Sequence, residues 1–247
     1  MRIDILTLFP DMCEAVVSES IIGRARKAGK VEINCVNIRD FSGNKHNKVD
    51  DTPYGGGMGM IMAAEPIYNA YMSLFNEGEE KPYLIYLSPK GQTFNQGTAV
   101  ELSKKEHIVL LCGHYEGIDE RVIDEIVDCE ISIGDFVLTG GELPALTVAD
   151  AVCRMLPSVL SEDICFEEES HFAGLLEYPQ YTKPAVWRGR EVPEVLLSGH
   201  HANISRWRRE KSIEETLKRR PDMIDKAELT KKDIKYIASL KNDEHDI

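Results

Sequence analysis

Short apolar runs and helical patterns of apolar residues alternate along the first half of the chain. The apolar runs have the length of β-strands and lie at 2–9, 31–38, 83–87 and 107–113. Between them, apolar residues recur at helical spacing over 14–28, 64–76 and 95–105. Strands that alternate with helices in this way predict an α/β fold with a largely parallel sheet.

The second half of the chain has a different pattern. We expect a longer helix that begins between Glu142 and Leu146 and ends near Leu156, where Pro157 stops it. The acidic stretch 158–184 has few periodic apolar positions, which is typical of a linker or loop. Helical patterns then return at 202–211, 212–220 and 230–241. Ser212 and Thr230 each precede an acidic residue by three positions, as in a capping box.

Composition and charge narrow the possible partners. The 247 residues are 43% hydrophobic, which allows one large domain or two smaller ones. The net charge of −13 argues against nucleic acid, because phosphate binding depends on Lys and Arg. However, 183–220 holds ten Lys and Arg against five acids, whereas 116–135 holds eight acids and one Arg. Such segregation predicts a basic surface for a polyanion. The alternative is a solvated helix face.

Cysteine use and the amino-terminal segment indicate the compartment. The six cysteines form no C-x-x-C pair, so we expect reduced core residues and neither a zinc site nor a disulfide framework. The apolar run within the first ten residues is too short for a signal peptide, and Asp4 interrupts it. No segment approaches the roughly 18 apolar residues of a membrane span. We therefore expect a cytoplasmic protein without membrane contact.

Three glycine-containing loops follow predicted strand ends. They cover 86–92, 112–121 and 132–142. Open α/β sheets bind ligands at the carboxyl ends of their strands, so the loops are expected to converge on one ligand. Gly140 and Gly141 would let a flat ligand approach the main chain. Neither a dinucleotide-binding G-x-G-x-x-G after the first strand nor a phosphate-binding P-loop is present, which leaves an adenine read by backbone groups as one possibility. Ordinary strand-to-helix turns are the alternative.

Seven motifs occur in a fixed order along the chain. They are LFPDM near the start, DDTPYGGGMGM at 50–60, SPKGQ at 88–92, CGHYEGIDERV at 112–122, SIGDFVLTGGELPA at 132–145, PQYTKP at 179–184 and LLSGHHANISRWR at 196–208. Together they closely resemble the bacterial tRNA (guanine-N(1)-)-methyltransferases, as far as about Pro221. These are knotted methyltransferases of the SPOUT class.

The resemblance implies a fold and a domain organisation. It implies an α/β domain over 1–160 with a parallel sheet and a deep trefoil knot between about 86 and 140. It further implies a flexible linker over 161–185 that carries the catalytic carboxylate, and a small α-helical tRNA-binding domain over 186–247. Members of this family work as homodimers with composite active sites.

The resemblance also implies a cofactor site built by the three glycine loops. The cofactor would be S-adenosylmethionine in a bent shape. The implied cofactor residues are Tyr86, Leu87, Ser88, Pro89, Gly113, Tyr115, Glu116, Gly117, Ser132, Ile133, Gly134, Phe136, Leu138, Gly140, Gly141 and Pro144. Glu116 is also a candidate for holding Mg²⁺, although the sequence has no dedicated metal-ligand spacing.

Two residues are candidates for catalysis. Guanine N(1) carries a proton at neutral pH, so methylation needs a general base. The family places an aspartate from the partner subunit in this role, directly before a serine, and alignment on the following motifs puts Glu169 there. Glu168 is the alternative base, and a solvated acidic run is the alternative interpretation. Arg154 would stabilise the negative charge that develops on the neighbouring carbonyl oxygen.

Further residues are implicated in binding the target guanine and the tRNA. By resemblance, the substrate-binding residues are His46, Asp50, Asp51, Gly57, Gly59, Ser170, Arg206 and Arg208. Met58 stands where the family usually has proline. An RNA loop fits this arrangement because its bases can be splayed into a pocket.

The sequence therefore predicts an enzyme that uses S-adenosylmethionine to methylate guanine N(1) in the tRNA anticodon loop. The target lies immediately 3′ of the anticodon, where its methylation supports reading-frame maintenance. One alternative is a related knotted methyltransferase that acts on another RNA position or on ribose. The other is a noncatalytic RNA-binding protein, to which the departures at Glu169 and Met58 lend slight support.

Overall fold

The computed structural model describes residues 1–160, 169–172 and 174–243, without the side chains of 241–243. The chain divides into two compact units, Met1–Asp163 and Ile164–Ile247. Within the described residues, no helix is both long and apolar enough to cross a membrane.

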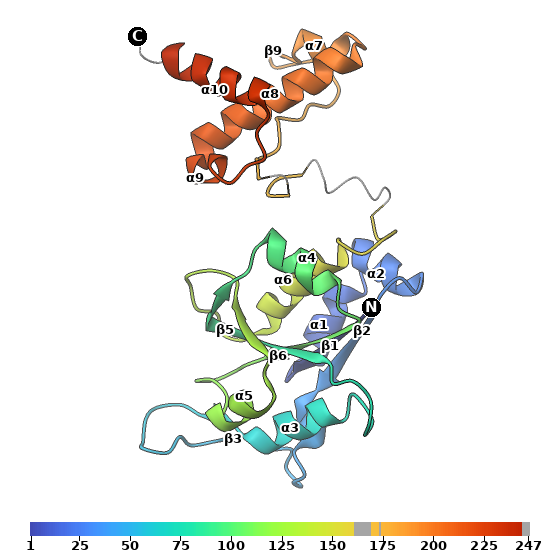
Figure 1. Cartoon of the computed structure of the whole chain (residues 1–247). Helices are drawn as coiled ribbons and strands as arrows, with labels where there is room; N and C mark the ends of the chain where they lie inside the picture. The colour runs from blue at the N-terminus through green and yellow to red at the C-terminus, as the bar shows by residue number, and fades with distance from the viewer. Residues whose placement is uncertain (161–168, 173, 244–247) are drawn as a thin grey trace. The chain divides into compact units, whose positions relative to one another are not determined.

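The first unit is built on a five-stranded parallel sheet (Figure 1). Its strands are β1 Arg2–Thr7, β2 Glu32–Asn37, β5 Tyr83–Thr93, β6 His107–Cys112 and β7 Cys129–Ser132. They lie in the order β2-β1-β6-β5-β7, and each neighbouring pair is parallel. The predicted parallel sheet is confirmed. Parallel strands need crossover connections, which is why helices separate most of them in the sequence.

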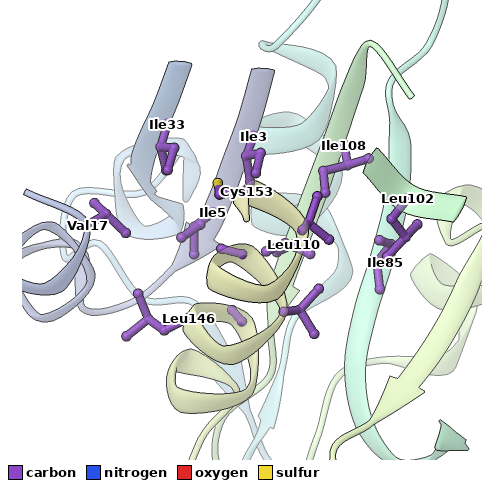
Figure 2. Packing of buried hydrophobic residues seen from close by; sticks show 14 of the residues in the cluster. Ile3, Ile5, Val17, Ile33, Ile85, Leu102, Ile108, Leu110, Leu146 and Cys153 are labelled. Carbon is purple, nitrogen blue, oxygen red and sulfur yellow. The ribbon is translucent and has the colours of Figure 1, made fainter. Parts of the chain in front are cut away.

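Helices cover both faces of this sheet, so the strands are apolar on both sides (Figure 1). One face carries α1 Pro10–Val17, α2 Ser20–Lys27, α4 Gln96–Ser103 and α6 Glu142–Cys153. The other carries the 3₁₀ helix η1 Ile38–Phe41, α3 Ala64–Met72 and α5 Glu120–Ile126. Figure 2 shows Ile3, Ile5 and Leu110 of the sheet beside Leu146 and Cys153 of α6.

Two predicted elements of this unit were wrong in extent. The single helix expected over 14–28 is two helices, because the chain turns at Ser20, whose φ is +55°. A Cβ on Gly23 would collide with the Ser18 carbonyl, so glycine is needed where the turn closes. The strand expected over 83–87 continues to Thr93, with a register shift between Leu87 and Gln92 in its pairing with β7. The short elements α5 and β7 were not predicted.

The second unit is mainly helical. Its elements are β8 Val186–Trp187, β9 Arg190–Glu191, α7 Glu194–Leu197, α8 His201–Arg219, α9 Pro221–Ile224 and α10 Lys231–Asp243. The predicted helix start at Ser212 is wrong, because Ser212 is buried within α8 and its carbonyl accepts a 2.6 Å hydrogen bond from Thr216. The capping box at Thr230 is confirmed. The Thr230 N–H donates to Asp233 at 2.8 Å, and the Asp233 N–H donates to the Thr230 hydroxyl at 3.3 Å.

The core of the second unit is small and includes part of the segment predicted as linker. Its buried apolar residues are Leu175, Ile213 and Ile237. The Leu176 N–H donates to the buried Thr216 hydroxyl at 2.8 Å. Gly174 has a φ of +77°, and a Cβ there would lie 2.8 Å from the Ala227 Cα. The predicted linker 161–185 therefore contains a packed portion at 174–176.

The described cysteines carry no disulfide. All five are free; Cys13, Cys112 and Cys153 are buried, and Cys35 and Cys129 are partly buried. The sixth, Cys165, lies outside the described residues.

Candidate active site

A pocket of about 280 Å³ is lined by the middle of β5 and by the segments that follow β6 and β7. All three predicted glycine loops line it, and so do fifteen of the sixteen predicted cofactor residues. The exception is Gly134, where an added Cβ would lie 2.6 Å from the Phe136 ring. Eight further lining residues were not named individually. Lys90, His114, Ile118, Glu120, Val137 and Thr139 lie within the predicted loops, and only Ile123 and Ile131 lie outside them.

The glycine pair is needed for a reason that the sequence did not reveal. The Gly141 N–H donates a 2.9 Å hydrogen bond to the Gly113 carbonyl, and Gly140 forms a β-bridge with His114. A Cβ on Gly141 would lie 2.7 Å from the Cys112 Cα. Gly141 was expected to let a ligand approach the main chain. The structure adds a second reason for glycine here, because a side chain at this position would collide with the end of β6.

Glu142 is a buried carboxylate behind the pocket wall that the sequence analysis missed. It is the first residue of α6, its exposure is 4%, and it accepts a 2.8 Å hydrogen bond from the buried Thr7 hydroxyl. The helix amino terminus favours its negative charge. Burial and, secondly, the charge of Glu142 raise the pKa of the Cys112 thiol well above its usual value. Cys112 therefore stays protonated and packs as a core residue.

The charged groups of the pocket wall leave it slightly negative. They are Lys90, Glu116 and Glu120. Lys90 lies 3.9 Å from Glu120, and both side chains are exposed. Burial, with a smaller contribution from Glu130 and Glu120, raises the pKa of Tyr86 to about 12, so its hydroxyl is neutral. A pocket with two carboxylates, one ammonium and much apolar and main-chain surface suits a cationic ligand better than a polyphosphate.

The predicted guanine-binding loop is attached to the cofactor loop. It runs between β3 Asp50–Asp51 and β4 Ile61–Met62, which pair antiparallel. The Glu116 N–H donates to the Met60 carbonyl at 3.0 Å, and the Met62 N–H donates to the Gly117 carbonyl at 2.9 Å. A Cβ on Gly59 would lie 2.5 Å from the Glu116 Cγ, so this glycine is needed for the contact.

The other predicted residues of this loop are exposed or conformationally special. His46 and Asp51 are exposed, and Gly57 has a φ of +140°. A hydrogen bond from the Thr52 N–H and the nearby Lys48 ammonium lower the pKa of Asp51. Asp51 is therefore ionised at neutral pH.

Arg154 lies away from the pocket of its own chain. It caps the carboxyl end of α6, whereas Glu142 begins this helix near the pocket. Twelve helical residues place these ends about 18 Å apart. The structure therefore does not bring Arg154 to the cofactor loops of the same chain.

The remaining predicted residues belong to the second unit. Glu169 is partly buried, and the Ser170 hydroxyl accepts a 2.9 Å hydrogen bond from the Glu177 N–H. On α8, Arg206 is exposed and lies 3.9 Å from Glu210. The Arg208 guanidinium lies over the Tyr178 ring at 4.8 Å. The alternative base, Glu168, lies outside the described residues.

No group of three or more His, Cys, Asp and Glu side chains suited to a metal ion occurs in the described part of the chain. Mg²⁺ stays a prediction.

Comparison with known proteins adds to this geometry. Residues 1–226 match the family model described as tRNA (Guanine-1)-methyltransferase TrmD. A tRNA (guanine-N(1)-)-methyltransferase from Ruminiclostridium cellulolyticum is 59% identical over 226 residues, which are 92% of this chain and 97% of that protein. The protein of the same name from Alkaliphilus oremlandii is 55% identical over 247 residues, which are 98% of this chain and 99% of that protein. The chain therefore belongs to the tRNA (guanine-N(1)-)-methyltransferase family, whose members are enzymes that methylate N(1) of guanine in tRNA.

Proposed function

We propose that this enzyme binds S-adenosylmethionine in the glycine-loop pocket and methylates the guanine immediately 3′ of the anticodon, which supports the reading frame. The observation that carries this proposal is the convergence of the three loops on one pocket, with fifteen of the sixteen expected residues in its wall. The volume, about 280 Å³, is just below the range of about 300–1,000 Å³ for small-molecule sites. We also propose a cytoplasmic location, where its tRNA substrate would be found.

The residues of the wall fit this cofactor. S-adenosylmethionine supplies a methyl group activated on a positively charged sulfur. Glu116 and Glu120 provide negative charge, and Ile133, Leu138 and Pro144 provide apolar surface for the adenosine. Neutral Tyr86 and the main chain of the glycine loops offer hydrogen bonds without a charge. An Mg²⁺ ion near Glu116 remains a proposal that rests on the resemblance.

Methylation requires loss of the proton on guanine N(1). We assign this step to the Glu169 carboxylate, which would accept the proton as the methyl group arrives. The negative charge that develops on the guanine carbonyl oxygen would be stabilised by Arg154. Both roles come from the family resemblance. The attachment of the 50–62 loop to the Glu116 loop supports a target base held close to the cofactor.

We further propose the trefoil knot and the three-part organisation expected from the sequence, with 186–247 as the tRNA-binding domain. Support for the knot comes from the segment that follows β7. The Gly141 N–H donates to the Gly113 carbonyl at 2.9 Å, so this segment returns from the edge strand β7 to the end of β6. Single-molecule stretching from the two termini tests the knot. The stretched chain is expected to be shorter than 247 extended residues, and a full-length contour would contradict the knot.

The final element of the proposal is a homodimer in which Glu169 of one subunit serves the pocket of the other. Glu169 belongs to the second unit and the pocket to the first, which allows the two to come from different chains. The test combines inactive variants as heterodimers. Leu138→Arg would block the pocket, and Glu169→Gln would remove the base. Activity in their verified heterodimer is expected, and none would argue against a shared site.

The same experiment assigns Arg154 to a chain. If Arg154 acts with its own pocket, Arg154→Ala should complement Glu169→Gln but not Leu138→Arg. If Arg154 reaches the partner's pocket, as its position about 18 Å along α6 from Glu142 favours, the pattern should be reversed. We expect the reversed pattern.

Two measurements test the function itself. Calorimetric titration with S-adenosylmethionine should give saturable binding with one site per chain, and mass mapping of tRNA nucleosides should place the new methyl group on guanine N(1). Methylated ribose or another base would favour a different knotted methyltransferase. Binding of tRNA without methylation would favour the noncatalytic alternative.

A further inference from the structure

The β8–β9 hairpin is a surface element without a core. Every residue from 181 to 191 is exposed. Val186 pairs with Glu191 and Trp187 with Arg190. Arg188 and Gly189 form the two-residue turn, and both have the positive φ that this turn needs, +51° and +76°. Isolated two-stranded hairpins are only marginally stable in water. An exposed hairpin that carries a tryptophan therefore suggests a surface that binds a partner molecule.

Strand pairing divides the hairpin into two different faces. Successive side chains of a strand point to opposite faces, and directly paired residues share a face. Trp187 and Arg190 therefore lie on one face, and Val186 and Glu191 lie on the other. The Arg188 guanidinium lies over the Trp187 ring, 5.0 Å from its centroid. The indole thus has one arginine stacked on it and another paired across from it.

The chemistry of this face fits a nucleic acid. Trp187 is 57% exposed, so much of its apolar surface is left to a partner. Lys183, Arg188 and Arg190 are the charged residues of 181–190, in a chain whose net charge is −13. Aromatic rings stack on nucleobases of any sequence, and arginine binds phosphate through its planar fork of N–H donors. An acidic protein surface would satisfy the arginines but would leave the indole without a matching flat partner.

We propose that Trp187, Arg188 and Arg190 form a tRNA-binding platform, in which an unpaired base stacks on the indole and the two guanidiniums bind the adjoining phosphates. This inference rests on tRNA as the substrate and extends it to a defined contact outside the cofactor pocket. It requires no particular assignment of the catalytic base. A second copy of this chain is the competing occupant, and the tests separate the two.

Tryptophan emission provides the first test, because the chain has only two tryptophans. In the full-length Trp207→Phe protein, Trp187 is the sole emitter. Transfer RNA should quench this emission in a saturable way, whereas S-adenosylmethionine should not. Emission that is unchanged at tRNA concentrations that saturate binding would overturn the proposal.

Affinity measurements provide the second test. Trp187→Ala should weaken tRNA binding about 5- to 150-fold, the range for losing one base-stacking contact, and should act on the KM for tRNA. Trp187→Phe should restore most of the affinity. The matched control on the opposite face, Val186→Ala, should leave it unchanged. Arg188→Ala and Arg190→Ala should each reduce the slope of log K against log salt by about 0.7–0.9.

The outcomes distinguish this platform from other interpretations. Equal tRNA affinity for Trp187→Ala and the unaltered protein would overturn the proposal. A Trp187→Ala protein that changes its sedimentation instead of its tRNA affinity would assign the hairpin to an interface between copies. The affinity of each variant for S-adenosylmethionine is measured in parallel. If the unaltered protein does not bind S-adenosylmethionine, that result would contradict the proposed function but would leave the tRNA-binding platform standing.

Discussion

The two units of this protein differ sharply in charge. The first unit, Met1–Asp163, holds 14 Lys and Arg against 26 Asp and Glu, a net charge of −12. The second unit, Ile164–Ile247, holds 15 against 16, a net charge of −1. A strongly acidic unit repels RNA phosphates but suits a cationic cofactor. The comparison therefore explains how one acidic chain can serve both a cationic cofactor and a polyanionic substrate.

The units also differ in how they are held together. The first has apolar clusters on both faces of its sheet and a pocket shaped by main-chain contacts such as Gly141 with Gly113. The second has a small apolar cluster around Leu175, Ile213 and Ile237 and also relies on polar pairs. Arg209, for example, lies 3.0 Å from Asp233 and donates to the Glu228 carbonyl at 2.7 Å. Each core residue of the second unit should therefore contribute a larger share of the stability of its unit than a core residue of the first unit does.

The largest expected effect concerns the proposed general base, Glu169, which belongs to the second unit. Glu169→Gln should reduce the single-turnover methylation rate by about 100- to 10,000-fold, the usual range for losing a general base. The affinities for S-adenosylmethionine and tRNA should stay close to normal, because the substitution keeps the shape of the side chain. Glu169→Asp, the residue usual in the family, should retain much of the rate.

Glu168→Gln is the matched control for that variant. A rapid Glu169→Gln enzyme together with a slow Glu168→Gln enzyme would transfer the role to Glu168.

The second prediction tests the small core. Ile213→Ala should lower the free energy of unfolding by about 2–5 kcal/mol, because Ile213 is fully buried in a cluster with few other members. Both tryptophans, Trp187 and Trp207, lie in the second unit, so urea unfolding followed by tryptophan emission reports on that unit. The control is Ile234→Ala on α10, which is 56% exposed and should change little. Similar losses from both variants would contradict the assigned core.

A third prediction concerns the glycine pair in the first unit. Gly141→Ala should destabilise this unit by about 1–3 kcal/mol, because the added Cβ would press on the β6 main chain at Cys112. It should also weaken binding of S-adenosylmethionine, since Gly141 lines the pocket. Hydrogen exchange of the β6 amides is the measurement. Gly97→Ala, whose nearest neighbour is the Asn95 side chain, is the control and should be neutral or stabilising. Unchanged hydrogen exchange of the β6 amides in Gly141→Ala would contradict the close contact between Gly141 and the β6 main chain.

The smallest effect is expected at the amino terminus of α10. Asp233→Asn should lower the free energy of unfolding at pH 7 by about 1–2 kcal/mol, because a neutral acceptor replaces the charged one that binds the Arg209 guanidinium and the Thr230 N–H. Burial alone would raise the pKa of Asp233, but hydrogen bonds from Arg209 and Thr230 outweigh it and lower the pKa. A group whose pKa is lowered by folding stabilises the protein above its unfolded pKa of about 3.9. That contribution is lost as the pH falls through the folded pKa.

The gap in stability between Asp233→Asn and the unaltered protein should therefore be constant above about pH 5 and should shrink below pH 4. Urea unfolding at pH 7 and pH 3 tests this. An equal gap at both values would show that the charge of Asp233 does not contribute.

Local pattern in the sequence predicted much of the fold and most of the pocket wall. Apolar runs followed by glycine loops predicted the parallel sheet. Strands that are buried on both faces are apolar throughout, and such runs can be recognised within a short segment of sequence. The capping box at Thr230 could also be predicted, because its two partners, Thr230 and Asp233, are only three positions apart. The break expected at Ser212 was wrong because burial of Ser212 and Thr216 against the core keeps α8 continuous. Packing decided that element.

Only the tertiary structure decided which distant groups meet. The Thr7 hydroxyl reaches Glu142 across 135 positions of sequence, which makes an ordinary first-turn glutamate a buried acid. The glycine loops were visible in the sequence, but the need for Gly141 depends on the main chain of β6, and the position of Arg154 depends on the length of α6. A sequence determines local conformation through short-range sterics and apolar spacing. Contacts between remote segments depend on the whole packed chain, because each is set by the shape and burial of everything around it.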